Sequence, residues 1–291
     1  KEISSWTEAK KFKSDIAIIS NPSSLHIDAA LKISGHVKGV FIEKPLSNNL
    51  SECNQLIDLL NNKKITSFVG HNLMFHPVIK KIIEFINEND IGEIINIQCQ
   101  VGQWLPDWHP YEDYTKAYYA RKDLGGGVSL SLIHEIHLAL ALAGLPAYVS
   151  GEITEYKQLK LDVDVCSDLM IKHKSGAVSQ IHLDFLQRPS HRSGLVTFEK
   201  AWLSYDFTKM EITAQRINEE PYQLFKNDDY DPNTMYINQM KEFISLVEEG
   251  RVRHKYDAPS SLESLKVVEA LFESSLSGKK VTIKRNEGFS F

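Results

Sequence analysis

Three short apolar stretches, each followed or preceded by a helical pattern, constrain the fold of this chain more than any other feature. They run from Asp15 to Ser20, from Val37 to Ile42 and from Thr66 to Gly70. Such apolar and β-branched runs are typical of strands buried on both faces of a parallel sheet. Strand, helix, strand, helix, strand at this spacing predicts a parallel α/β sheet with right-handed crossovers. We therefore expect a partial doubly wound parallel sheet within residues 1–92.

The pattern changes after Gly92, where strands follow one another with short turns between them. A turn such as Lys174–Gly176 joins consecutive strands, which predicts antiparallel pairing. The predicted strands include 94–101, 168–173, 177–185, 195–199 and 202–205, and the predicted helices cover about 129–142, 234–248 and 261–276. We expect an α+β domain over residues 93–291 with an open-faced, mainly antiparallel sheet, whose last helices pack back on the first domain.

Composition and charge exclude several classes of protein. Hydrophobic residues make up 42% of the chain and charged residues 24%, as in ordinary globular proteins. The longest apolar runs stop well short of the roughly 20 residues that span a bilayer. A formal net charge of −5 without a basic cluster argues against a nucleic-acid partner. The three cysteines lack CxxC spacing, so we expect neither disulfides nor a zinc knuckle, and a cytoplasmic location.

Two short motifs carry residues suited to catalysis. Glu43-Lys44-Pro45 ends the second predicted strand, at the edge where parallel sheets present ligands. His134 and His137 lie on the predicted helix after the glycine run at an i,i+3 spacing, which departs from the i,i+4 pair of zinc proteases. We therefore predict no metal site. His134 is a candidate proton-transfer group, while a structural histidine and a solvated turn lysine are the alternatives at the two positions.

Five motifs, in order along nearly the entire chain, resemble the Gfo/Idh/MocA family of nicotinamide-dependent sugar oxidoreductases. They are Asn21-Pro-Ser-Ser-Leu-His26, Glu43-Lys-Pro45, Gly70-His-Asn-Leu-Met-Phe-His-Pro77, Gly125-Gly-Gly127 followed by His134 and Gly144, and the aromatic stretch from Gly102 to Pro110 with Tyr114 and Tyr118. The aromatic stretch is similar to a branch often associated with surface-polysaccharide and nucleotide-sugar pathways. The resemblance implies a Rossmann-type dinucleotide-binding domain followed by an open-faced sheet domain.

The resemblance also implies hydride transfer between a sugar or nucleotide-sugar carbon and the nicotinamide of NAD or NADP. It makes His134 the base and Lys44 the cation that holds the reacting hydroxyl. The implied cofactor contacts are Asn21, Pro22, His26, Glu43 and Lys44, and the expected substrate contacts are Trp104, Trp108, Tyr114, Tyr118, Ser131 and Arg192. We also expect a homo-oligomer that forms through the open face of the sheet.

Two departures from the family pattern leave alternatives open. Where relatives usually carry an Asp before the histidine of the catalytic helix, this chain has Leu130 and Ser131, and His137 replaces a second Asp. The Gly-x-Gly-x-x-Gly turn that binds the pyrophosphate is not found before Asp15, so we expect the amino-terminal cofactor segment to be missing. One alternative is a non-catalytic relative that binds a sugar ligand or a partner without redox turnover. Another is a metal-dependent hydrolase that uses His134 and His137.

Overall fold

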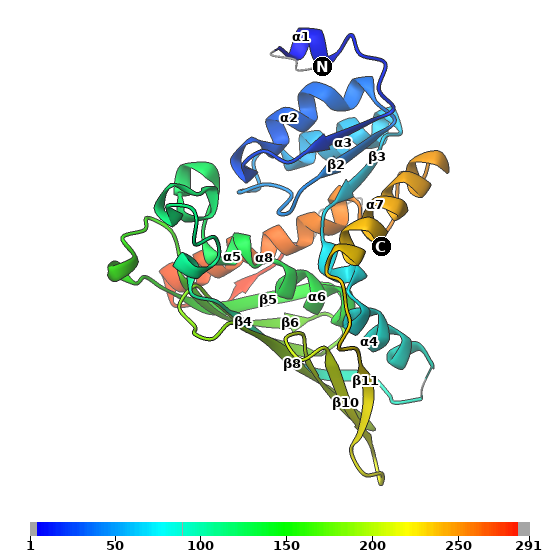
Figure 1. Cartoon of the computed structure of the whole chain (residues 1–291), viewed down its shortest axis with the longest axis vertical. Coiled ribbons are helices and arrows are strands. Elements are labelled where there is room, and N and C mark those ends of the chain that lie inside the picture. The colour runs from blue at the N-terminus through cyan, green and yellow to red at the C-terminus, as the bar shows by residue number, and fades with distance from the viewer. Residues whose placement is uncertain (1–4, 89, 285–291) are drawn as a thin grey trace.

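A computed structural model describes residues 5–88 and 90–284 and contains two sheets in that part of the chain. The smaller sheet consists of three parallel strands in the order β1 (Ile16–Ile19), β2 (Gly39–Ile42) and β3 (Thr66–Val69). Helices α2 (His26–Ile33) and α3 (Cys53–Lys63) form the crossovers between these strands (Figure 1). Every residue of β2 and β3 is buried, as their apolar composition predicts.

The larger sheet contains nine strands in the order β11-β10-β9-β8-β4-β7-β6-β5-β12. Its neighbouring strands are antiparallel except for β4 and β7, which run parallel. The strands are β4 (Ile94–Gly102), β5 (Pro146–Thr154), β6 (Cys166–His173), β7 (Val178–Asp184), β8 (His191–Phe198), β9 (Ala201–Asp206), β10 (Glu211–Arg216), β11 (Tyr222–Lys226) and β12 (Val281–Thr282). The predicted fold class, a small parallel sheet followed by a mainly antiparallel one, is confirmed.

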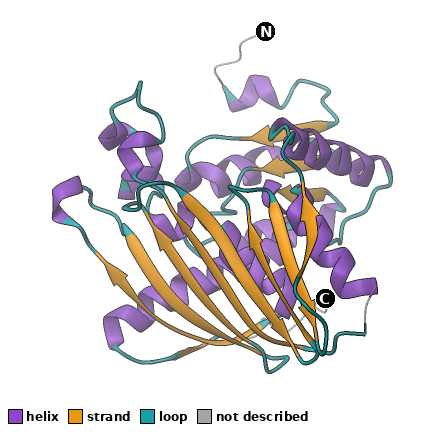
Figure 2. Cartoon of the chain, turned by 60° about the horizontal axis from the view of Figure 1, so that its bottom comes forward, coloured by secondary structure: helices purple, strands orange, loops and turns teal. Residues whose placement is uncertain are grey.

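One face of the larger sheet carries helices and the other, here called the open face, does not (Figure 2). Burial alternates along β6, where Ser167, Leu169 and Ile171 are buried and Asp168 and Met170 are more accessible. This period of two places the apolar side chains under the helices and the polar ones on the open face.

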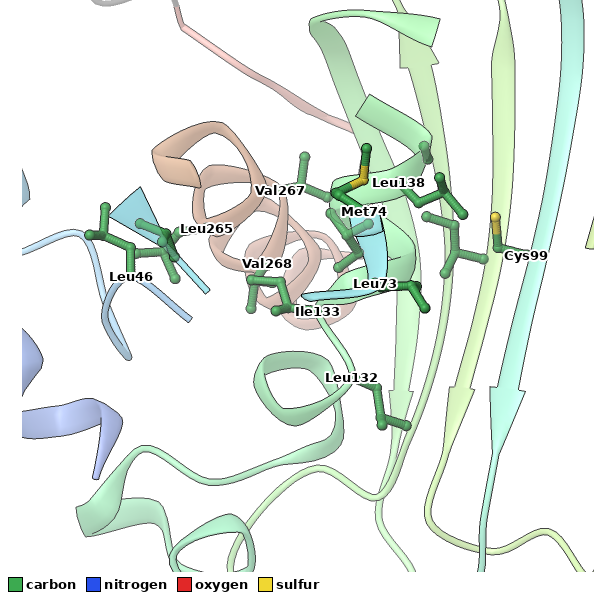
Figure 3. Packing of buried hydrophobic residues seen from close by; sticks show 14 of the residues in the cluster. Leu46, Leu73, Met74, Cys99, Leu132, Ile133, Leu138, Leu265, Val267 and Val268 are labelled. Atoms are coloured by element: carbon green, nitrogen blue, oxygen red, sulfur yellow. The ribbon is translucent and has the colours of Figure 1, made fainter. Parts of the chain in front are cut away.

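Helices from the end of the chain connect the two sheets. Helix α8 (Ala258–Ser277) contacts both β3 and β5 and lies between the sheets in Figure 1. Helix α7 (Asn233–Glu248) packs Phe243 edge-on against Phe41 and Phe68, with ring centroids 5.6 Å and 5.8 Å apart. Figure 3 shows side chains of α8 among buried residues such as Leu46 and Ile133. The two sheets therefore share one hydrophobic core.

The region after the glycine run differs from the single helix that the sequence predicts. It divides into α5 (Val128–Ser131) and α6 (His134–Ala143), and the helical segments on either side of the break meet at 49°. No single helix in residues 5–88 and 90–284 is long and apolar enough to cross a membrane. The bent pair, 122–131 with 134–143, passes that test on length and composition alone, and the residues of α5 are all buried.

The remaining helices are short or lie outside the sheets. Helix α1 (Trp6–Ala9) precedes β1, and α4 (Pro77–Glu88) leads from the small sheet into β4. The aromatic segment between β4 and α5, expected as a loop, contains four short 3₁₀ turns within 105–124. Strands β10, β11 and β12 extend the larger sheet beyond the strands that the sequence specified.

Candidate active site

A hollow of about 410 Å³ lies where the end of β2 meets the larger sheet. Lys44, two residues after β2, lines it together with Trp108, Ser131, His134 and Arg192. These are five of the residues that the sequence predicts to be catalytic or substrate-binding, and they come from four separate segments. The hollow is also lined by residues that sequence reasoning missed, among them Gln103, His109, Ser190, His191 and Thr208.

The break between α5 and α6 fixes the position of Lys44. In a continuous helix the carbonyl of Ser131 would accept the N–H of Glu135. The break leaves that carbonyl free, and Nζ of Lys44 donates to it at 2.6 Å. Burial lowers the pKa of Lys44 to about 8, against the opposing charge of Glu43. The ammonium group is thus held inside the hollow and binds its proton less firmly than an exposed lysine does.

His134 begins α6 and, partly buried, lies next to the buried His71 and His137. Its ring lies edge-on to His71, with centroids 5.8 Å apart, and His71 stacks on His137 at 3.7 Å and 2°. Nε2 of His71 and Nδ1 of His137 contact the hydroxyls of Ser261 and Ser264, each at 3.1 Å. Burial lowers the pKa of all three histidines, with the charge of Lys44 adding to the effect on His134. The imidazole of His134 is therefore neutral near pH 7, and its buried Nδ1 has no partner.

In the described part of the chain, a metal ion at His134 and His137 would need a third donor close to both. Neither belongs to a set of three or more histidine, cysteine or carboxylate donors whose ligand atoms lie within 4.8 Å of one another. The ring of His137 instead contacts the hydroxyl of Ser264 and stacks on the ring of His71.

An ion pair joins α6 to β8 at the wall of the hollow. Nε of Arg192 donates to Oε1 of Glu135 at 2.6 Å, and the side chain of Glu135 is only 2% exposed. Nη2 of Arg192 and Oε2 of Glu135 are buried without partners, and Ser131 Oγ likewise. Ser131 and Arg192 line the hollow, so their unpartnered atoms are polar groups that a ligand there can satisfy.

The residues predicted to contact a cofactor gather at the carboxyl ends of β1 and β2. The ring nitrogens of His26 lie 2.8 Å from the carbonyl oxygens of Asn21 and Pro45, so His26 ties the two strand ends together. Burial lowers the pKa of His26 and raises that of Glu43. This edge is where doubly wound sheets bind their ligands. The roles of Asn21, Pro22, His26 and Glu43 toward a cofactor remain predictions.

Three of the four predicted aromatic contacts lie away from the hollow. The guanidinium of Arg188 stacks 4.4 Å from the ring centroid of Trp104, and the hydroxyl of Tyr114 donates to the carbonyl of Leu159 at 3.4 Å. Tyr118 is 41% exposed, and its pKa is raised by burial of its hydroxyl and by the charge of Glu43. Trp108 alone of the four lines the hollow.

Two family descriptions match consecutive parts of this chain. Residues 2–71 match "Oxidoreductase family, NAD-binding Rossmann fold", and residues 79–204 match "GFO/IDH/MocA C-terminal domain". Together they cover most of the sequence, in the order expected from the motifs.

Individual relatives are more distant. The chain is 25% identical over 206 residues to a levoglucosan dehydrogenase of Pseudarthrobacter phenanthrenivorans, a match that covers 62% of this chain and 51% of that protein. It is 24% identical over 172 residues to a myo-inositol 2-dehydrogenase of Thermotoga maritima, covering 57% and 48%. The matches thus span about half the length of these two relatives.

Solved structures show the same fold. A levoglucosan dehydrogenase in complex with NADH and levoglucosan has a TM-score of 0.86 at 17% identity, with 97% of this chain and 84% of that chain covered. An aldose-aldose oxidoreductase from Caulobacter crescentus has a TM-score of 0.80 at 19% identity, with 92% and 79% covered. With both family descriptions matched in order, the chain belongs to the Gfo/Idh/MocA family of oxidoreductases.

Proposed function

We propose that this protein transfers a hydride between a nicotinamide cofactor and a hydroxyl-bearing carbon of a sugar. One observation carries the proposal: Lys44 and His134, which are far apart in the sequence, line the same hollow. Relatives named as levoglucosan, D-xylose and myo-inositol dehydrogenases support the substrate class.

The protonation states of the two side chains suit alcohol oxidation. The reaction breaks a C–H bond and an O–H bond, and a bound nicotinamide supplies the acceptor for the hydride. The ammonium of Lys44 stabilises the developing alkoxide, and the neutral imidazole of His134 takes the hydroxyl proton. Ser131 supports Lys44 through its carbonyl and presents an unpaired hydroxyl to the substrate.

The cofactor is expected along the carboxyl ends of β1 and β2. The buried carboxyl group of Glu43 stands beside Lys44, where it is suited to accept hydrogen bonds from ribose hydroxyls. NAD is the cofactor that the matched family description names, while use of NADP stays a prediction. A nucleotide-sugar substrate, a place in surface-polysaccharide biosynthesis, a cytoplasmic location and assembly through the open face also stay predictions.

The test replaces the two proposed catalytic residues and one exposed histidine in the full-length protein. Lys44→Ala and His134→Ala should each lower turnover by about 10²–10⁴, measured as NADH absorbance over a panel of anhydrosugars, inositols, pentoses and nucleotide sugars. His36→Gln, at an exposed histidine that does not line the hollow, is the matched control and should keep most of the activity. Near-normal turnover in both alanine variants would refute the assignment.

A further inference from the structure

A second group of reactive side chains lies on the open face of the larger sheet, outside the hollow. Cys166 and Asp168 belong to β6, and His182 and Asp184 to β7. The antiparallel register sets Cys166 opposite Asp184 and Asp168 opposite His182. The four side chains are therefore direct or diagonal cross-strand neighbours on one face. The proposed hydride transfer uses none of them.

Three of these residues place metal-ligand atoms close together. The donor atoms of Cys166, Asp168 and His182 all lie within 4.8 Å of one another. Nδ1 of His182 is 2.7 Å from Oδ1 of Asp168, and Oδ2 of Asp168 is 3.8 Å from Sγ of Cys166. Tetrahedral zinc with bonds of about 2.0–2.3 Å separates its ligand atoms by roughly 3.3–3.8 Å. Small rotations of these accessible side chains reach that spacing.

Asp184 stands where metal sites place a supporting carboxylate. Its Oδ2 lies 3.0 Å from Nε2 of His182, and its Oδ1 accepts the backbone N–H groups of Leu186 and Gln187, both at 2.6 Å. Gly102, opposite on β4, leaves room for this side chain, because a Cβ there would collide with the carboxylate. A carboxylate in this position holds a proton on Nε2, so the Nδ1 that now donates to Asp168 is the nitrogen that would bind a metal ion on losing its proton.

Acidic side chains lie next to the group, and Lys279 and Lys280 line the same cavity of the open face. Glu152 on β5 lies opposite Asp168 in the strand register. The uncharged Gln100 on β4 lies opposite His182. The salt bridges that the structure gives for Asp168 and Asp184 both go to His182. The imidazole of His182 thus contacts two carboxylates, and the thiol of Cys166 lies beside Asp168, a donor set of the kind that Zn²⁺ binds.

We propose that Cys166, Asp168 and His182 bind one Zn²⁺ ion, with Asp184 as the positioning residue for His182. Water occupies the fourth ligand position. The ion would tie β6 to β7 directly before the segment that leads to Arg192, so its effect is on the stability of that wall of the hollow. The site is independent of the reaction proposed above.

Metal titration of the EDTA-treated, dialysed protein tests this site. We expect one equivalent of Zn²⁺ to bind with a dissociation constant in the low micromolar range or below, and Co²⁺ to give a thiolate-to-cobalt absorption band. Cys166→Ser should abolish the band, and Asp168→Asn, His182→Gln and Asp184→Asn should each weaken Zn²⁺ binding by about tenfold or more. His36→Gln, an exposed histidine of the other sheet region, is the matched control and should bind Zn²⁺ normally.

Thiol labelling gives a second readout that needs no variant. Cys53 and Cys99 are buried, whereas Cys166 is partly exposed and should react first with iodoacetamide. One equivalent of Zn²⁺ should suppress that labelling and raise the melting temperature of the unaltered protein. Circular dichroism checks that each variant is folded. Failure of the unaltered protein to bind stoichiometric Zn²⁺, or unchanged affinity in both Cys166→Ser and His182→Gln, overturns the proposal.

Discussion

Removing one partner of the Arg192–Glu135 ion pair should cost more stability than removing the other. The pair closes at 2.6 Å between α6 and β8, and the side chains of Arg192 and Glu135 are 27% and 2% exposed. Arg192→Met leaves the Glu135 carboxylate without a counter-charge at a position that water does not reach. Glu135→Gln leaves a guanidinium that lines the hollow and faces the ring of Phe207 at 5.4 Å.

The size of the difference follows from these environments. Removing one partner of a fully buried pair costs about 3–5 kcal/mol, and the partial exposure of Arg192 weakens the pair by solvent screening. We therefore expect Arg192→Met to lower the free energy of unfolding by about 3 kcal/mol. Glu135→Gln keeps a hydrogen-bond acceptor and should cost about 1 kcal/mol.

Urea unfolding followed by circular dichroism measures both losses, with an unchanged m value as the sign that the same surface unfolds. The double variant Arg192→Met with Glu135→Leu should be more stable than Arg192→Met alone, because no unpaired charge remains buried. Equal losses in the two single variants, or a larger loss from Glu135→Gln, would refute this reasoning.

Three further predictions concern the hollow and the backbone that forms it. Burial lowers the pKa of Lys44 to about 8, so its charge is lost as the pH rises through that value. We therefore expect kcat/KM to fall in the same pH range. A pH profile of kcat/KM without this alkaline limb would contradict the role of Lys44. Ser131→Asp should raise the pKa of His134 and move the acidic limb of the profile to higher pH, whereas an unchanged limb would show that position 131 does not act on His134. Gly126→Ala would bring a Cβ within 2.6 Å of the carbonyl oxygens of Tyr118 and Tyr119. We expect this substitution to lower the free energy of unfolding by about 1–3 kcal/mol. Urea unfolding without a measurable loss of stability would count against that contact.

The elements of the fold could be predicted where the sequence pattern is local. The apolar runs at β2 and β3 predict buried strands because both faces of a parallel strand are covered, and Phe41 and Phe68 are fully buried there. The position of Lys44 at the candidate site follows from the same argument, since a residue just after such a strand lies at the ligand-binding edge of the sheet. The resemblance to a family added Ser131 and Trp108 and gave His134, already a candidate for proton transfer, the role of base; all three line the hollow together with Lys44.

The contacts that give the site its chemistry depend on residues far apart in the chain. Arg192 meets Glu135 across 57 residues, and Lys44 meets the carbonyl of Ser131 across 87. The sequence predicted one continuous helix there, because the apolar residues Leu132 and Ile133 at the break satisfy a helical pattern as well as a buried bend.

The open face shows the same division between sequence and structure. Alternation along β6 and β7 indicates which residues share a face, so Asp168 and His182 were each predictable as accessible side chains. Their contact depends on the cross-strand register, which sets Asp168 opposite His182. A shift of one residue would place the two strands' side chains on opposite faces, and many distant packing contacts together exclude that shift. The sequence by itself determined most of the strands, whereas tertiary packing decided which side chains meet, because pairing energy is collective over the sheet and no local segment encodes it.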